Sequence, residues 1–164
     1  MVIIMLCITF LILVALITAS IIRRIRNENN NRMSFRESVN LTDLPVLTFY
    51  NNGKKLNLLL DTGSTHSHIN SSILKQLEYE KTDEELSLTG MEGNSVIINS
   101  CKMIINYNNK KFEEEFGITD LEDAFNTVKQ ESGVQIHGIL GSRFFEKYKY
   151  IIDFKENVKN TIKK

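Results

Sequence analysis

The stretch Leu58-Leu59-Leu60-Asp61-Thr62-Gly63-Ser64 places an acidic residue directly after three leucines. A run of large apolar side chains is typical of a buried strand. The glycine that follows the acid permits a tight turn and lets another stretch of backbone approach closely. The stretch therefore predicts a buried strand that presents the Asp61 carboxylate at a turn. On its own it is a weak functional signal, because an ordinary strand-to-turn bend has the same composition.

A second apolar string that ends in glycine, Gly138-Ile139-Leu140-Gly141, lies far downstream of Asp61. Alone it predicts only a buried strand that ends in a turn. Between the two strings lies Thr89-Gly90-Met91-Glu92-Gly93-Asn94, whose glycines predict the exposed tip of a hairpin between residues 86–88 and 95–99. The order of the three features is much more specific than any one of them.

The chain after residue 45 alternates short strand patterns with turn signals. These patterns predict strands over residues 46–50, 55–60, 101–107, 110–118, 134–140 and 150–154. Helical signals predict short helices over residues 71–77, 119–131 and 142–149, the second of them ended by Gly133. The fold class is therefore mainly β with two or three short helices.

Residues 1–22 are almost wholly apolar and contain no charged side chain. About 20 apolar residues in a helix span the core of a bilayer. A cleaved signal peptide carries positive charge before its apolar stretch, so the sequence favours a retained, single-pass transmembrane anchor. Arg23, Arg24 and Arg26 follow directly, and such clusters tend to stay on the cytoplasmic side. The globular part is expected in the cytoplasm; the alternative is an export signal that delivers it to the periplasm.

Composition limits the remaining domain organisation and the partners. Residues 23–40 are basic and Asn-rich and predict a flexible juxtamembrane linker, residues 41–158 form the predicted domain, and residues 159–164 form a basic, frayed tail. The chain has 20 basic and 20 acidic side chains, which argues against nucleic-acid binding. Cys7 and Cys101 offer no zinc-ligand spacing, and neither a metal nor a cofactor is expected.

The Asp61 turn, the glycine-bearing hairpin tip and Ile139-Leu140-Gly141 together resemble the retropepsin-like (retroviral-type) aspartic proteases, specifically their bacterial single-domain, membrane-anchored members. The resemblance covers residues 41–158. It implies a small closed β-barrel preceded by one transmembrane helix. It also implies an endopeptidase that hydrolyses peptide bonds with a water molecule activated by aspartate, acting on a peptide or protein substrate.

The resemblance further implies a role for each motif residue. Asp61 would be the catalytic residue, and Thr62, Gly63 and Ser64 would complete its loop. Thr62 would bond across to its counterpart in a second chain, and Gly63 would lie beside the substrate backbone. The flap that would close over the substrate consists of Gly90, Met91, Glu92 and Gly93. The support that would pack beneath the loop consists of Ile139, Leu140 and Gly141. Leu58, Met91 and Ile139 would line an apolar substrate site.

The number of candidate aspartates predicts the assembly. Of the six aspartates in the chain, only Asp61 is followed by Thr-Gly or Ser-Gly. Aspartic protease chemistry needs two carboxylates that share one proton, so one chain supplies half of the site. The active form is therefore expected to be a homodimer with the site on its two-fold axis.

A few positions depart from the family pattern. Arg143 stands where many members have Asp or Asn, and Thr65 and His66 stand where an acidic residue is common. These changes bear on the dimer contacts and leave open a catalytically inactive, membrane-tethered peptide-binding module of the same fold.

A metal site that uses His66 and His68 is disfavoured because no carboxylate or cysteine ligand set accompanies them. A serine nucleophile at Ser64 is disfavoured because the sequence has no Gly-x-Ser-x-Gly motif, which forms the nucleophile elbow of serine hydrolases.

Overall fold

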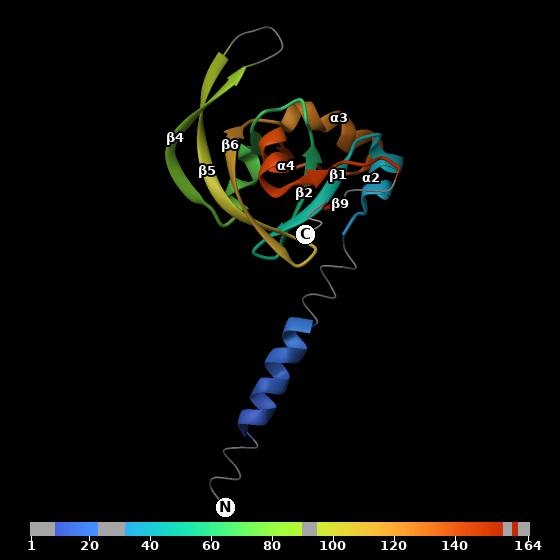
Figure 1. The fold of residues 1–164 in the computed structure, drawn as a ribbon, viewed down its shortest axis with the longest axis vertical. Helices are drawn as coiled ribbons and strands as arrows, with labels where there is room; N and C mark the ends of the chain where they lie inside the picture. The colour runs from blue at the N-terminus through green and yellow to red at the C-terminus, as the bar shows by residue number, and fades with distance from the viewer. Residues whose placement is uncertain (1–8, 23–31, 90–94, 156–158, 161–164) are drawn as a thin grey trace, which may run out of the picture. The chain divides into compact units, whose positions relative to one another are not determined.

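The computed structural model describes residues 9–22, 32–89, 95–155 and 159–160. The chain divides into two compact units, Met1–Arg32 and Met33–Lys164. In the first unit, residues 9–22 form a helix (Figure 1). All of its side chains are exposed, including the apolar Phe10, Leu11 and Ile17. Across the described ranges, no helix combines the length and the apolar character that crossing a membrane requires.

The second unit is built mainly from strands. Its elements follow one another in the order α2 (Phe35–Thr42), β1 (Val46–Asn51), β2 (Lys54–Leu60), β3 (Ser67–Asn70), the 3-10 helix η1 (Ser71–Gln76), β4 (Glu80–Thr89), β5 (Ser95–Tyr107), β6 (Lys110–Thr119), α3 (Glu122–Ser132), β7 (Gly138–Leu140), α4 (Ser142–Tyr148), β8 (Tyr150–Ile151) and β9 (Lys159–Asn160).

The sheet closes on itself to form a barrel. Its strand order is β1-β2-β7-β3-β6-β5-β4, and an additional pairing joins β1 to β5 at Tyr50 and Asn106. The side chain of Asn106 donates to the Tyr50 carbonyl at 3.2 Å across this seam. Strands β1, β2, β7, β3, β6 and β5 therefore form a closed barrel, and β4 extends the sheet beyond it as the partner of β5 (Figure 1). The predicted mainly β, closed-barrel fold is confirmed.

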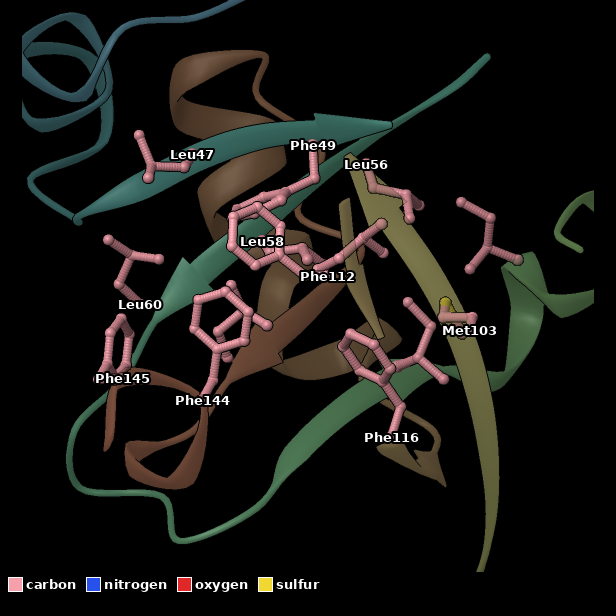
Figure 2. Close-up of a cluster of buried hydrophobic side chains, with 14 of the residues drawn as sticks. Leu47, Phe49, Leu56, Leu58, Leu60, Met103, Phe112, Phe116, Phe144 and Phe145 are labelled. Carbon is pink, nitrogen blue, oxygen red and sulfur yellow. The ribbon is translucent and has the colours of Figure 1, made fainter. Parts of the chain in front are cut away.

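The leucines of β2 are consecutive because both faces of this strand are buried. Leu58 and Leu60 point into the main core, which also contains Phe49, Phe112 and Phe144 (Figure 2). Leu59 points the other way and packs on a second core formed by Met33, Val46, Phe125 and Ile136. A strand buried on both faces reads as a continuous apolar run. The core of the fold thus begins directly behind Asp61.

The N-terminal boundary of the folded unit differs from the prediction. The polar composition of residues 34–40 predicts a flexible linker, but the structure places α2 at Phe35–Thr42. Ser34 and Glu37 form a reciprocal capping box at its start, and Phe35 and Ser38 are buried. The linker prediction is wrong here because the Ser-x-x-Glu capping pattern and the buried side chains outweigh the polar composition. The boundary predicted at residue 41 falls inside this helix.

Several smaller elements also differ from their predicted extents. Residues 134–137 are not a strand, and β7 begins only at Gly138. The predicted last strand shrinks to β8, which pairs with β9 at Lys159–Asn160, inside the segment predicted to be frayed. Strand β3 was not predicted, because three of its four residues are polar. The helix α3 ends at Ser132, and Gly133 follows as its C-cap with φ of 74°, which confirms the predicted stop at this glycine.

Candidate active site

The two apolar strings found in the sequence are neighbouring parallel strands. Leu58 pairs with Gly138 and Leu60 with Leu140. The pairing continues one residue further, because the Asp61 N–H donates to the Leu140 carbonyl at 3.0 Å. Asp61 therefore emerges where both strands end, and the second string lies directly beside the turn that carries it.

The turn at Asp61 is stabilised by the aspartate itself. The Gly63 N–H donates to Asp61 Oδ1 at 2.9 Å, and the Ser64 N–H donates to the Asp61 carbonyl at 3.3 Å. A Cβ on residue 63 would lie 3.1 Å from Asp61 Oδ1, so a larger residue would crowd the carboxylate. Asp61 is half-buried, whereas Thr62 and Gly63 are exposed. The carboxylate is thus oriented by backbone and still reachable from solvent.

The first turn of α4 holds the rest of the loop. The Ser142 N–H donates to the Ser64 carbonyl at 2.7 Å, and the Arg143 N–H donates to the Thr65 carbonyl at 3.3 Å. The Ser64 hydroxyl donates to the His66 carbonyl at 2.8 Å. Because α4 buries Phe144 in the main core, these bonds fix the loop to the body of the barrel.

Gly141 is a glycine because another backbone passes too close for a side chain. A Cβ at this position would lie 2.4 Å from the His66 carbonyl oxygen, which is well inside contact distance. The Gly141 N–H donates to the Ser67 hydroxyl at 3.2 Å. The second glycine string therefore ends at the point where it supports the far end of the Asp61 loop.

The residues that depart from the family pattern lie against one another. Arg143 Nη1 is 3.4 Å from His66 Nδ1, while its backbone holds Thr65. Burial and then the charge of Arg143 lower the pKa of His66, against an opposing effect of Glu115. Burial and His66 likewise lower the pKa of His68, although Asp61 opposes this. Both imidazoles are therefore biased towards the neutral form beside the Asp61 loop.

A buried carboxylate, which the sequence analysis did not identify, lies behind the loop. Glu114 is only 6% exposed, and its Oε1 accepts a hydrogen bond from the Ser67 hydroxyl at 2.8 Å. Burial raises the pKa of Glu114, opposed by the Ser67 hydrogen bond and by Lys147, whose Nζ is 3.9 Å from Oε2. The alternation Phe112-x-Glu114-x-Phe116 along β6 was the available signal, since alternate residues share a face.

Some predicted site residues lie elsewhere or outside the described residues. The proposed flap residues Gly90, Met91, Glu92 and Gly93 fall outside them; β4 and β5 pair up to Thr89 and Ser95 on either side. The sequence predicts that Leu58 and Ile139 line the substrate site. This prediction is wrong for Leu58, because its side chain is fully buried in the main core. Ile139 is half-buried against the second core.

Within the described ranges, no group of three or more His, Cys, Asp or Glu side chains is placed to hold a metal ion. The histidines next to the loop point to different neighbours. His66 contacts Arg143, and His68 is buried between β6 and β7. Asp61 is the half-buried acid that the loop carries.

Among the solved structures similar to this chain are three retroviral or retropepsin-like proteins. They include the EIAV protease complexed with the inhibitor HBY-793 (18% identity, TM-score 0.49, 70% of this chain and 97% of that chain). A retroviral protease-like domain of Ddi1 from Leishmania major has 11% identity and a TM-score of 0.48, covering 72% of this chain and 86% of that one. A retropepsin-like aspartic protease from Rickettsia conorii has 13% identity and a TM-score of 0.41, covering 70% and 78%. A search of curated proteins finds no match.

The sequence itself matches a protein-family model described as "Aspartyl protease" over residues 47–144. The match spans more than half of the chain. It runs from β1 to the first turn of α4 and so includes the Asp61 turn, the glycine-ended strand beside it and the backbone bonds that join them. The chain therefore belongs to the aspartyl protease family.

Proposed function

We propose that this protein is an aspartic endopeptidase that works as a homodimer, with Asp61 of each subunit supplying one of the two catalytic carboxylates. The observation that carries the proposal is the state of Asp61. Its Oδ1 accepts from the Gly63 N–H at 2.9 Å, and the residue is half-buried at the point where β2 and β7 end. A reachable, backbone-oriented carboxylate in a family member is suited to act on a water molecule.

The mechanism follows from two such carboxylates brought face to face. Like charges so close do not both ionise, so the pair holds one proton and titrates as a unit. The ionised carboxylate takes a proton from water as the water oxygen attacks the peptide carbonyl carbon, while the protonated one donates to the carbonyl oxygen. The C–N bond then breaks as the leaving nitrogen accepts a proton from the pair.

The remaining motif residues are assigned supporting roles in this proposal. Thr62, exposed beside Asp61, would bond to its counterpart across the two-fold axis, and Gly63 would leave room for the substrate backbone. Gly90, Met91, Glu92 and Gly93 would close over a bound peptide. The substrate is a peptide or protein in extended form, and no cofactor takes part.

We also propose that residues 1–22 anchor the protein in a membrane as a single span, with the protease domain in the cytoplasm. The support is the uncharged apolar sequence, the basic residues Arg23, Arg24 and Arg26 after it, and the exposed apolar side chains of the helix over residues 9–22. Fractionation of cells followed by protease treatment of sealed vesicles tests this. A domain found in the periplasm would replace it with the export alternative.

The test of the enzymatic proposal is cleavage by the full-length protein in detergent or membranes. Wild type, Asp61→Asn and Asp83→Asn are incubated with denatured protein across a range of pH. Asp83 is an exposed aspartate of β4 and serves as the matched control. Asp61→Asn is expected to lose activity by about a thousandfold or more, as for removal of other catalytic groups, while Asp83→Asn keeps it. If wild type never cleaves and Asp61→Asn is indistinguishable from it, the inactive peptide-binding module is the better description.

A further inference from the structure

Ser67 links the Asp61 loop, the second glycine string and the interior of the barrel. It is the first residue of β3, directly after the loop, and it is buried. Its hydroxyl accepts from the Gly141 N–H at 3.2 Å and donates to Glu114 Oε1 at 2.8 Å. Because a hydroxyl has a single hydrogen, the donation to Glu114 leaves a lone pair correctly placed for Gly141.

We propose that Glu114 is a positioning residue for the active site. It orients Ser67, and Ser67 in turn fixes the Gly141 peptide that supports the loop carrying Asp61. Its catalytic consequence rests on the proposed protease function, but its structural consequence does not.

The path from Gly141 to Asp61 is short. The residue before Gly141 is Leu140, whose carbonyl accepts from the Asp61 N–H at 3.0 Å. The residue after it, Ser142, donates to the Ser64 carbonyl at 2.7 Å. The Gly141 N–H and the Leu140 carbonyl belong to one peptide unit, so a rotation of that unit moves the acceptor of the Asp61 N–H. Displacements of about 1 Å at a catalytic group can cost about a hundredfold in rate.

The surroundings of Glu114 show which contact compensates for the burial of its carboxylate. Burying a carboxylate is costly unless it is paired or hydrogen-bonded. Across the sheet it faces the apolar Met103 of β5, and the charged groups nearby are Lys147 of α4 and its own neighbours Glu113 and Glu115. The Lys147 contact at 3.9 Å is longer than a hydrogen bond. The short, well-formed contact of Glu114 is the one to Ser67.

The experiment compares Glu114→Ala, Glu114→Gln and Glu113→Ala in the full-length protein. Glu113 is the matched control, because it is the neighbouring acid on β6 and its side chain is exposed. Glutamine keeps an oxygen that accepts from Ser67 but has no charge, so it is the conservative rescue. The readouts are kcat and KM on one peptide, and hydrogen exchange of the Gly141 and Asp61 amides by NMR, with Ile105 of β5 as the reference amide.

For Glu114→Ala we expect kcat to fall by about tenfold or more with KM little changed, because loop geometry and not peptide binding is altered. The Gly141 and Asp61 amides should exchange about tenfold faster, while Ile105 keeps its protection. Glu114→Gln and Glu113→Ala should stay within about twofold of wild type. If Glu114→Ala does not fold, Ser67→Ala, which cuts the same link, is measured in its place.

The inference is overturned if Glu114→Ala, or Ser67→Ala in its place, leaves kcat and both amides as in wild type. It is also overturned if Glu114→Gln loses as much as Glu114→Ala, since the hydrogen-bond route would then not matter. A wild type without proteolysis at any pH refutes the proposed function instead, and the exchange of the two amides still decides the role of Glu114.

Discussion

At the scale of single residues, His137 is held in its neutral form mainly by its burial. The ring Nδ1 of His137 accepts from the Asn57 backbone N–H at 3.0 Å. The backbone N–H of His137 donates to the Asn57 carbonyl at 2.8 Å. Burial and then the charge of Lys54 lower the pKa of His137 to about 4. The residue joins β2 to the segment leading into β7, so its protonation affects the strand pair that positions Asp61.

This predicts a loss of stability in acid. The unfolded chain, with an ordinary histidine pKa of 6.5, binds a proton at a higher pH than the folded chain. The stabilisation is therefore complete above pH 6.5 and declines as pH falls to about 4, by about 3 kcal/mol in total. Denaturant unfolding between pH 7 and pH 4 should show this decline in wild type.

The matching variant is His137→Asn, whose side-chain oxygen can accept from Asn57 but has no proton to gain. Its free energy of unfolding should decline less over the same range. His66→Asn is the comparison, because the His66 ring is less buried and its removal should flatten the curve less. An unchanged pH dependence in His137→Asn would rule out this residue as the source.

Two glycines allow a second prediction at this scale. Gly141→Ala places a Cβ 2.4 Å from the His66 carbonyl oxygen, so backbone must move, at a cost of about 3 kcal/mol. Gly133→Ala meets nothing within 4 Å and pays only for its φ of 74°, about 1 kcal/mol. Thermal or denaturant unfolding measures both. Equal losses of unfolding free energy in the two variants would mean that the crowding at Gly141 is relieved without strain. Activity should fall only in Gly141→Ala.

At the scale of elements, α2 is part of the barrel unit and not of a linker. The buried Ser38 hydroxyl accepts from the Val46 N–H at 3.1 Å, which joins the helix to the start of β1. Phe35 packs in the main core and Met33 in the second one. A soluble fragment that begins at residue 41 would therefore lose part of both cores.

The capping box gives this element its own test. Ser34→Ala removes the acceptor of the Glu37 N–H and should lower the free energy of unfolding by about 1 kcal/mol. Arg36→Ala, an exposed change in the same turn, should have little effect. Denaturant titration followed by circular dichroism measures both. No effect of Ser34→Ala on global unfolding would show that α2 melts independently of the barrel.

The elements that sequence reasoning predicted well are those with strong local signals. The β2 run and the string before Gly141 are apolar enough to identify alone, and Gly133 ends α3 as expected. Strand β3 has little apolar character, and its pairing with β6 and β7 is non-local. No local pattern encodes such pairing. For the same reason Ser67 and Glu114, distant in sequence and joined only by the fold, were not recognised as a pair.

At the scale of the whole molecule, barrel closure explains why the two motif strings form one site. β7 pairs with β2 on one side and β3 on the other, so the strands before and after the Asp61 loop share a neighbour. The sequence predicted that the strings belong together only through their order and family resemblance. In the sequence, Arg143 and Thr65 stand out only as departures from the family pattern. Their backbone hydrogen bond becomes evident only in the folded structure.

The last prediction concerns the number of subunits at the site. If each site needs two Asp61 side chains, then a mixed dimer with one Asp61→Asn subunit is inactive. Co-expression of wild type with an equal amount of Asp61→Asn should then reduce activity per wild-type chain to about half, and a tenfold excess of the variant to about a tenth. Asp83→Asn keeps its own activity, so at the same excess it should leave activity per total chain unchanged. A site complete within one chain would keep the same activity per wild-type chain at any excess of Asp61→Asn, because an inactive partner removes nothing from it. Activity that follows the squared fraction of wild-type chains therefore indicates two Asp61 carboxylates per site.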